Sequence, residues 1–166
     1  VVVIQYRLGP LGFFAHPAVS ETSGANFALL DHVAALEWIE REITQFGGNA
    51  ANVTIFGESA GGQNVAALMA SPASRDLFDR AIIQSGLFDS VPLEEAQSGS
   101  EQSAIPAAGR MVEGPVNAIA LRAASLDQVF DAYDLGASRG SLPRVIADGV
   151  TLPSSGLASA FQSGNY

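Results

Sequence analysis

The run Gly57–Gly61 reads Gly-Glu-Ser-Ala-Gly, the G-x-S-x-G spacing that presents a serine hydroxyl for nucleophilic attack. The serine of this motif, Ser59, takes up a strained backbone conformation, and side chains two positions before or after it would collide across the tight turn. Gly57 and Gly61 satisfy that requirement. If a helix follows, its N-terminus favours negative charge at Ser59, and the Ala60 N–H can donate to an oxyanion. The spacing therefore predicts acyl transfer through Ser59.

The residues on either side of the motif predict the strand and the helix that position it. Val53–Phe56 is a short β-branched and aromatic run, predicted to be a buried strand. Ala60–Ala70 consists of good helix formers, and Pro72 ends that helix. Ala81–Gln84 is predicted to be the next strand. Together they form a βαβ unit, whose crossover is expected to be right-handed.

The rest of the chain alternates predicted strands and helices, which favours an α/β architecture. The continuous apolar run at the start of Val1–Leu8 is typical of a parallel strand covered on both faces. Asn26 is predicted to cap a helix over Phe27–Ile43, and Gly47 follows its end. The later elements are short: helices between residues 93 and 135, one of them opened by a Ser125–Gln128 capping box, a strand at Arg144–Ala147 and a helix at Leu157–Gln162.

A different interpretation of Gly57–Gly62 is a glycine-rich turn that cradles a phosphate between a strand and a helix. A dinucleotide fingerprint needs G-x-G-x-x-G, and a P-loop needs a lysine after its last glycine. Neither spacing occurs here, and no lysine follows the turn. A nucleotide-binding βαβ domain is therefore a hypothesis without a supporting motif.

The turn Gly57–Gly61, called the nucleophile elbow below, and several other stretches resemble the type-B carboxylesterase and cholinesterase family. The similar stretches lie mainly in the first 88 residues and comprise Tyr6–Phe13, Asn26, Leu30, Asp31, Phe46–Asn49, Asn52–Phe56, Gly57–Gly62 and Gln84–Gly86. Looser similarity continues at Leu121, Arg122, the Ser125 helix, Asp148, Gly149, Leu152 and Pro153. The resemblance implies a partial α/β-hydrolase fold, with a mostly parallel sheet, helices on both faces and part of a helical cap. As one domain, residues 1–88 would form the sheet core with the elbow, and 89–166 a cap-like region and the start of the return to the sheet.

The same resemblance implies roles for individual residues. Ser59 would be the nucleophile and Ala60 a backbone oxyanion donor, while Glu58 and Ser85 would lie beside the site, Ser85 near the acid of the triad. A solvated carboxylate and a plain strand-end turn remain the alternatives for Glu58 and Ser85. The substrate class implied is a small-molecule carboxylic ester, cleaved without a cofactor.

The histidine of a Ser-acid-His triad is expected after the serine in an α/β-hydrolase. No histidine follows Ser59; His16 and His32 both precede it, and we expect them to be ordinary loop and helix-surface residues. We therefore expect the chain to be an internal fragment, with the acid, the histidine and a glycine-rich oxyanion loop outside it. Alone, it is predicted to be inactive.

Composition limits the partners. Seventeen acidic and eight basic side chains give a net charge of −9, which disfavours binding to nucleic acid and to anionic membranes. The absence of cysteine excludes disulfides and thiolate metal sites, and no apolar run approaches the roughly 20 residues of a membrane span. No metal is expected, since the acidic residues of the 27–43 helix mostly face solvent. Localisation and oligomeric state stay open, with a secreted or periplasmic location slightly favoured over the cytoplasm.

An alternative from another class is a cholinesterase-like binding or adhesion domain that kept the fold and lost catalysis. The intact elbow around Ser59 argues against it. The lack of a downstream histidine does not favour it, because truncation explains that equally well.

Overall fold

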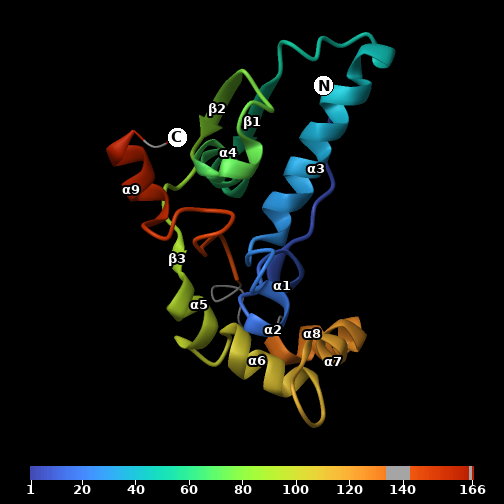
Figure 1. Cartoon of the computed structure of the whole chain (residues 1–166), viewed down its shortest axis with the longest axis vertical. Helices are drawn as coiled ribbons and strands as arrows, with labels where there is room; N and C mark the ends of the chain where they lie inside the picture. Colours follow the sequence, from blue (N-terminus) through green and yellow to red (C-terminus); the bar gives the residue numbers. More distant parts are fainter. Residues whose placement is uncertain (134–142, 165) are drawn as a thin grey trace.

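The structure of the chain is a computed structural model that describes residues 1–133, 143–164 and 166. Figure 1 shows β1, β2 and α4 toward one end of the molecule, α5–α8 at the other, and α3 running between them. The elements in chain order are α1 Gly9–Gly12, α2 Pro17–Ser20, α3 Phe27–Glu42, η1 Ile43–Phe46, β1 Thr54–Glu58, α4 Ala60–Ala70, η2 Pro72–Ser74, β2 Arg80–Gln84, β3 Val91–Pro92, α5 Leu93–Ser98, α6 Ala104–Met111, α7 Ala118–Ala123, α8 Leu126–Tyr133, β4 Ile146–Ala147 and α9 Gly156–Ser163.

The predicted strand-helix-strand unit is present. β1 and β2 pair in parallel, with Thr54 opposite Arg80 and Glu58 opposite Gln84, and α4 forms the connection between them. α4 spans the predicted residues, Ala60–Ala70, and ends before Pro72, whose ring cannot continue a helix. Both strands end at the same edge of the sheet, so the residues that follow them lie next to each other.

β1 is less buried than the sequence predicted, and β2 shows the same burial pattern. Burial alternates along both, and the apolar side chains Phe56 and Ile82 are 57% and 52% exposed. Ile55 points the other way and packs against Val33 of α3 and Leu68 of α4 in a small apolar cluster. The expected buried strand is therefore wrong for this chain, because α4 covers one face of the β1–β2 pair while Phe56 and Ile82 face solvent on the other.

The start of the chain is not the predicted strand. Residues 1–8 form no strand, and Val1 and Val3 are exposed. The segment instead runs beside α3 (Figure 1). There the Arg7 guanidinium pairs with the Asp31 carboxylate at 2.7 Å, and the ring centroids of Tyr6 and His32 lie 4.2 Å apart. A β-branched run favours a strand only where a neighbouring strand accepts its hydrogen bonds, and residues 1–8 make none of that kind.

The long helix α3 agrees with its prediction to within one residue, but Asn26 does not cap it. Asn26 occupies the N-cap position without a side-chain cap bond. Its fully buried amide instead accepts from the Ile146 N–H at 2.8 Å and donates to the Ile146 carbonyl at 2.8 Å and the Thr151 hydroxyl at 2.7 Å. The side chain thus joins the start of α3 to β4, a contact across 120 residues that local sequence cannot reveal.

Asp148 is the centre of the same buried network. One carboxylate oxygen accepts from the Ala25 N–H at 2.7 Å, the Asn26 amide at 3.1 Å and the Thr151 hydroxyl at 2.7 Å. The other accepts from the N–H groups of Val150, Thr151 and Leu152, at 2.8 to 3.0 Å. Six donors on one carboxylate fix the turn after β4 against the start of α3.

We expect Asp148→Asn to lower the free energy of unfolding by about 3 kcal/mol, since the amide nitrogen would face donors and several charge-assisted bonds would be lost. The matched control is Asp131→Asn on the exposed side of α8, expected to change stability by less than about 0.5 kcal/mol. Urea unfolding followed by circular dichroism measures both. Equal midpoints for the two variants would contradict the role given to Asp148.

Among the described residues of the second half, the short helices α5 to α8 lie within the 93–135 range predicted for them. The Ser125 capping box is confirmed: the Gln128 side chain accepts from the Ser125 N–H at 2.8 Å, and the Ser125 hydroxyl accepts from the Gln128 N–H at 3.2 Å. The main apolar core combines residues of both halves, among them Phe13, Leu29 and Leu157, so packing does not separate them at residue 88. The division of roles between 1–88 and 89–166 stays a prediction.

None of the helices in the described part of the chain is long and apolar enough to cross a membrane.

Candidate active site

Ser59 stands between β1 and α4, one residue after the strand ends and one before the helix begins. Its backbone has φ 53° and ψ −117°, a conformation that L-residues rarely adopt. Its N–H donates to the Gln84 carbonyl on β2 at 2.9 Å, which ties the turn to the neighbouring strand. The residue is exposed. The turn therefore holds a strained serine at the carboxyl edge of the sheet, within reach of a ligand in solvent.

Close backbone contacts explain the glycine at 57 but not the one at 61. A Cβ on Gly57 would lie 2.4 Å from the carbonyl carbon and oxygen of Gly61, closer than real Cβ atoms come. A Cβ on Gly61 would meet nothing within 4 Å, so the predicted collision is wrong at that position in this structure. A side chain at position 57 would therefore meet the main chain of Gly61, whereas a side chain at position 61 would have open space.

Sequence reasoning assigned no role to Gly62 and Gly86, which the structure places in close contact. A Cβ on Gly62 would lie 2.9 Å from the Gly86 Cα, and one on Gly86 would lie 2.6 Å from the Gly62 carbonyl carbon. The first turn of α4 therefore packs directly on the backbone that follows β2. The third glycine of the run Gly57–Gly62 was the available signal for this contact.

We expect Gly57→Ala to disrupt the elbow, because its methyl group would overlap backbone that cannot move without shifting the first turn of α4. Overpacking of this kind typically costs about 1–3 kcal/mol. Gly109→Ala is the matched control, since a Cβ there meets nothing within 4 Å. Thermal melting of both variants measures the difference, and a Gly57→Ala protein as stable as Gly109→Ala would rule out the close contact.

The residues predicted to surround Ser59 lie at the same edge of the sheet. Glu58 ends β1 opposite Gln84, so Ser59 and Ser85 are the next residues along two paired strands. Ser85 is also exposed and has φ 53°, a second strained serine beside the first. Ala60 begins α4, so its N–H is among the first four of the helix, which have no acceptor within it. The placement of Glu58, Ala60 and Ser85 is thus compatible with their predicted roles, which stay predictions.

The two histidines have partners of their own. The Nδ1 atom of His16 accepts from the Ala18 N–H at 3.2 Å at the start of α2. His32 is 8% exposed, and its Nδ1 lies 2.6 Å from the Ala28 carbonyl. Burial lowers the pKa of His32, although the Ala28 bond and the Asp31 charge oppose that shift. The expected helix-surface position is wrong for His32, because the Tyr6 ring of the N-terminal segment covers that side of α3.

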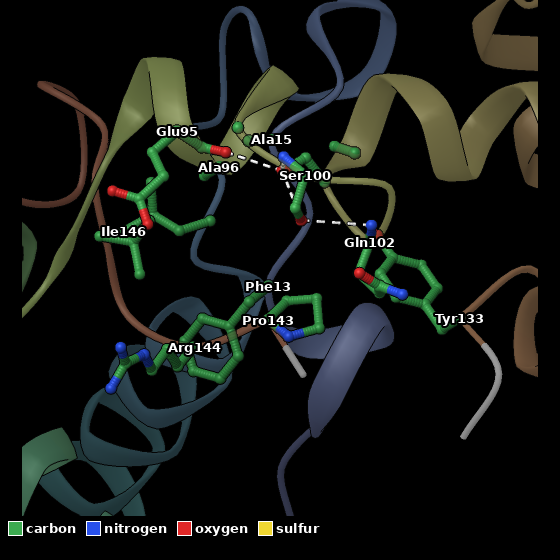
Figure 2. Close-up of a pocket in the computed structure, with 14 residues that line it drawn as sticks. Phe13, Ala15, Glu95, Ala96, Ser100, Gln102, Tyr133, Pro143, Arg144 and Ile146 are labelled. Carbon is green, nitrogen blue, oxygen red and sulfur yellow. Dashed lines mark hydrogen bonds between the residues drawn. The ribbon is translucent and has the colours of Figure 1, made fainter. Parts of the chain in front are cut away.

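Two cavities in the described part of the chain lie away from the serine. The first, of about 230 Å³, is bounded by the α5–α6 connection, the Phe13–Ala15 segment and Pro143–Ile146, and Ser59 does not line it (Figure 2). The second, of about 620 Å³, is lined by the end of α4 and by residues near the C-terminus such as Pro153. Within the described ranges no three His, Asp or Glu side chains are grouped so as to hold a metal ion.

A sequence profile of the carboxylesterase family matches residues 1–129, more than half of the chain. The chain belongs to the carboxylesterase family. It is 40% identical to a liver carboxylesterase of Sus scrofa over 92% of its own length, and 48% identical to the para-nitrobenzyl esterase of Bacillus subtilis over 60% of its length. It spans 29% and 20% of those two proteins.

Solved structures of the carboxylesterase family confirm the α/β-hydrolase fold. A PNB esterase structure superposes with a TM-score of 0.81 at 32% identity, covering 97% of this chain and 33% of that one. A carboxylesterase from Geobacillus stearothermophilus superposes with a TM-score of 0.80 at 30% identity, covering 97% of this chain and 33% of that one. The resemblance read from the elbow and its flanking stretches is therefore confirmed at the level of family and fold.

Proposed function

We propose that this carboxylesterase chain supplies the nucleophile of a carboxylic-ester hydrolase, and that the nucleophile is Ser59. The observation that carries the proposal is the exposed, strained Ser59 between β1 and α4, at the N-terminus of the helix. A hydroxyl held there attacks an ester carbonyl, releases the alcohol and leaves an acyl-serine, which water then cleaves. The printed names of the relatives, para-nitrobenzyl esterase and liver carboxylesterase, support this class of substrate.

We assign the other roles from the family resemblance, and the positions of these residues at the edge of the sheet support them. The Ala60 N–H belongs to the first turn of α4, where the helix N-terminus favours negative charge, and would stabilise the tetrahedral oxyanion. Gly57 allows the turn to close, and Glu58 and Ser85 border Ser59. A histidine must take the proton of the Ser59 hydroxyl and pass it to the leaving alcohol. Among these 166 residues no histidine follows Ser59. We propose that the histidine and its acidic partner come from other residues of the whole protein.

The experiment is covalent labelling of the whole protein with a fluorophosphonate, followed by peptide mapping of the adduct and by release of alcohol from a short-chain aryl ester. We expect one adduct, on the peptide that carries Ser59, and loss of ester turnover in proportion to labelling. A whole protein that is neither labelled nor active would refute the enzyme and favour the binding or adhesion domain.

A further inference from the structure

A buried amide joins the first turn of α4 to the segment that follows β2. The Gln63 side chain, 9% exposed, donates from Nε2 to the Asp89 carboxylate at 2.6 Å and to the Asp89 main-chain carbonyl at 2.9 Å. The Gln63 N–H donates to the Ser59 carbonyl at 3.0 Å. Gln63 is therefore bonded to the serine through its backbone and to Asp89 through its side chain.

Asp89 is held from a second direction. Its other carboxylate oxygen accepts from the Arg144 guanidinium at 3.0 Å, across 55 residues of sequence. The Arg144 and Asp89 side chains are 57% and 48% exposed, so this ion pair contributes little to stability. Its effect is geometric, because each oxygen of Asp89 has a different donor and the carboxylate is fixed toward Gln63. Arg144 also lines the cavity of Figure 2.

These bonds fix both ends of the 85–89 segment beside the elbow. At one end the Ser59 N–H holds the Gln84 carbonyl, and at the other Gln63 holds Asp89. Between them lie the strained Ser85 and the exposed apolar side chains of Leu87 and Phe88. The Phe88 ring meets the Phe161 ring of α9 edge-on, with the centroids 4.7 Å apart.

We propose that Gln63 and Asp89 are positioning residues for the reaction at Ser59, and that Arg144 orients Asp89. Their bond keeps the 85–89 segment at a set distance from the first turn of α4, and so sets the surroundings of the nucleophile. A misplacement of about 1 Å at a reacting group can cost about a hundredfold in rate. This inference rests on the proposed function of Ser59.

A polarity swap in the whole protein tests it. Gln63→Glu places a carboxylate against the Asp89 carboxylate and carbonyl, so that two acceptors face each other. Adding Asp89→Asn to that variant supplies an amide donor opposite the new carboxylate at position 63. The double variant has the net charge of the wild type. We normalise kcat/KM to the amount of Ser59 that a fluorophosphonate labels. We expect this value to fall about tenfold in Gln63→Glu and to return to within about threefold of wild type in the double variant.

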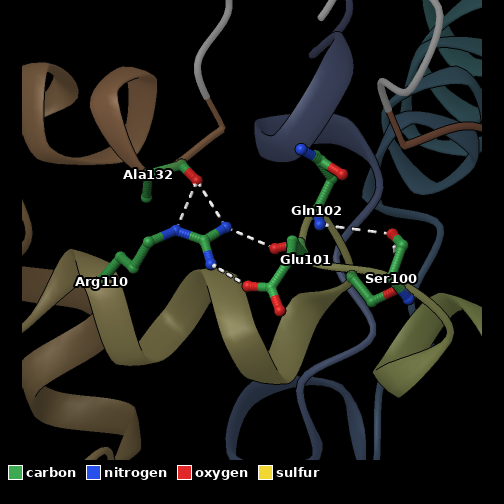
Figure 3. Close-up of polar contacts among 6 residues, drawn as sticks. Ser100, Glu101, Gln102, Arg110 and Ala132 are labelled. Carbon is green, nitrogen blue, oxygen red and sulfur yellow. Dashed lines mark hydrogen bonds and ion pairs between the residues drawn. The ribbon is translucent and has the colours of Figure 1, made fainter.

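The control is Glu101→Gln, which breaks an exposed ion pair at 3.2 Å to Arg110 on α6, while Arg110 keeps its two bonds to the Ala132 carbonyl (Figure 3). It is expected to leave kcat/KM unchanged. Melting temperatures of all variants separate a structural effect from a positioning effect. We expect kcat/KM to be rescued in the double variant whether or not its melting temperature differs from that of the wild type. If the loss of kcat/KM in the double variant equals the combined losses of Gln63→Glu and Asp89→Asn, with no rescue, the proposal is overturned.

A Gln63→Met variant keeps the test decisive if Gln63→Glu does not fold. It removes the bond without adding charge, and we expect a fall of about threefold in kcat/KM per titratable serine. An unchanged value there would also overturn the proposal. A wild-type protein that a fluorophosphonate does not label refutes the proposed function itself, whereas a labelled, active wild type with additive variants refutes only the positioning role.

Discussion

Ester hydrolysis by the whole protein is expected to fall about a million-fold in kcat when Ser59 is replaced by alanine, the loss measured when a serine hydrolase loses its nucleophile. The hydroxyl makes no capping bond in the structure, so its removal takes away the attacking atom and little else. The strained backbone at φ 53° is equally strained for alanine and for serine. Fluorophosphonate labelling should disappear together with turnover, while the melting temperature stays close to that of the wild type.

Ser98→Ala is the matched control for that experiment. Ser98 is an exposed serine on α5 whose hydroxyl donates to the Glu94 carbonyl at 3.2 Å, and its loss should leave labelling and turnover unchanged. Labelling that persists in Ser59→Ala, or turnover above the background rate, would show that another residue is the nucleophile.

The second large effect concerns the 166-residue chain by itself, for which we expect no ester turnover above background. A serine without its histidine base is about a million-fold less active in the best-studied serine hydrolase. Here no histidine follows Ser59, and His16 and His32 are bonded to Ala18 and Ala28. Alcohol release by the purified chain, compared with its own Ser59→Ala variant, measures the residual activity.

A difference between those two preparations would mean that a base is present in the chain. His32→Gln then identifies it: if activity disappears with His32, the assignment of that residue as a buried structural histidine is refuted. Activity in the whole protein together with inactivity of the chain is the expected pair of results.

Local signals in the sequence were enough for the elbow and for most helices. α4 and the Ser125–Gln128 capping box were predicted residue for residue, because capping, proline and glycine effects act within a few positions along the chain. α3 and α9 were predicted to within one residue at each end, and β2 to within one at its start. The place of Ser59 between a strand and a helix followed from the G-x-S-x-G spacing together with the strand-forming and helix-forming residues on either side of it.

Errors arose where a distant partner decides the outcome. Val1–Leu8 has the composition of a buried strand, yet it lies along α3, because strand formation depends on an available edge and not on propensity. Asn26 has the side chain of an N-cap, yet it bonds to β4 and Thr151 instead. His32 was expected on the helix surface, yet Tyr6 covers it.

The sequence by itself determined the strand-turn-helix around Ser59 and the family, and it predicted Ser59 as the nucleophile, because these depend on residue types at short fixed spacings. Only the tertiary structure decided that Gly62 and Gly86 are in close contact beside the elbow, and that Gln63, Asp89 and Arg144 converge next to it. Those contacts join residues 24 to 55 positions apart along the chain. Parallel pairing of β1 with β2 and packing of α4 bring the first two pairs together, and parallel pairing of β3 with β4 brings Arg144 to Asp89. No spacing in the sequence encodes that approach.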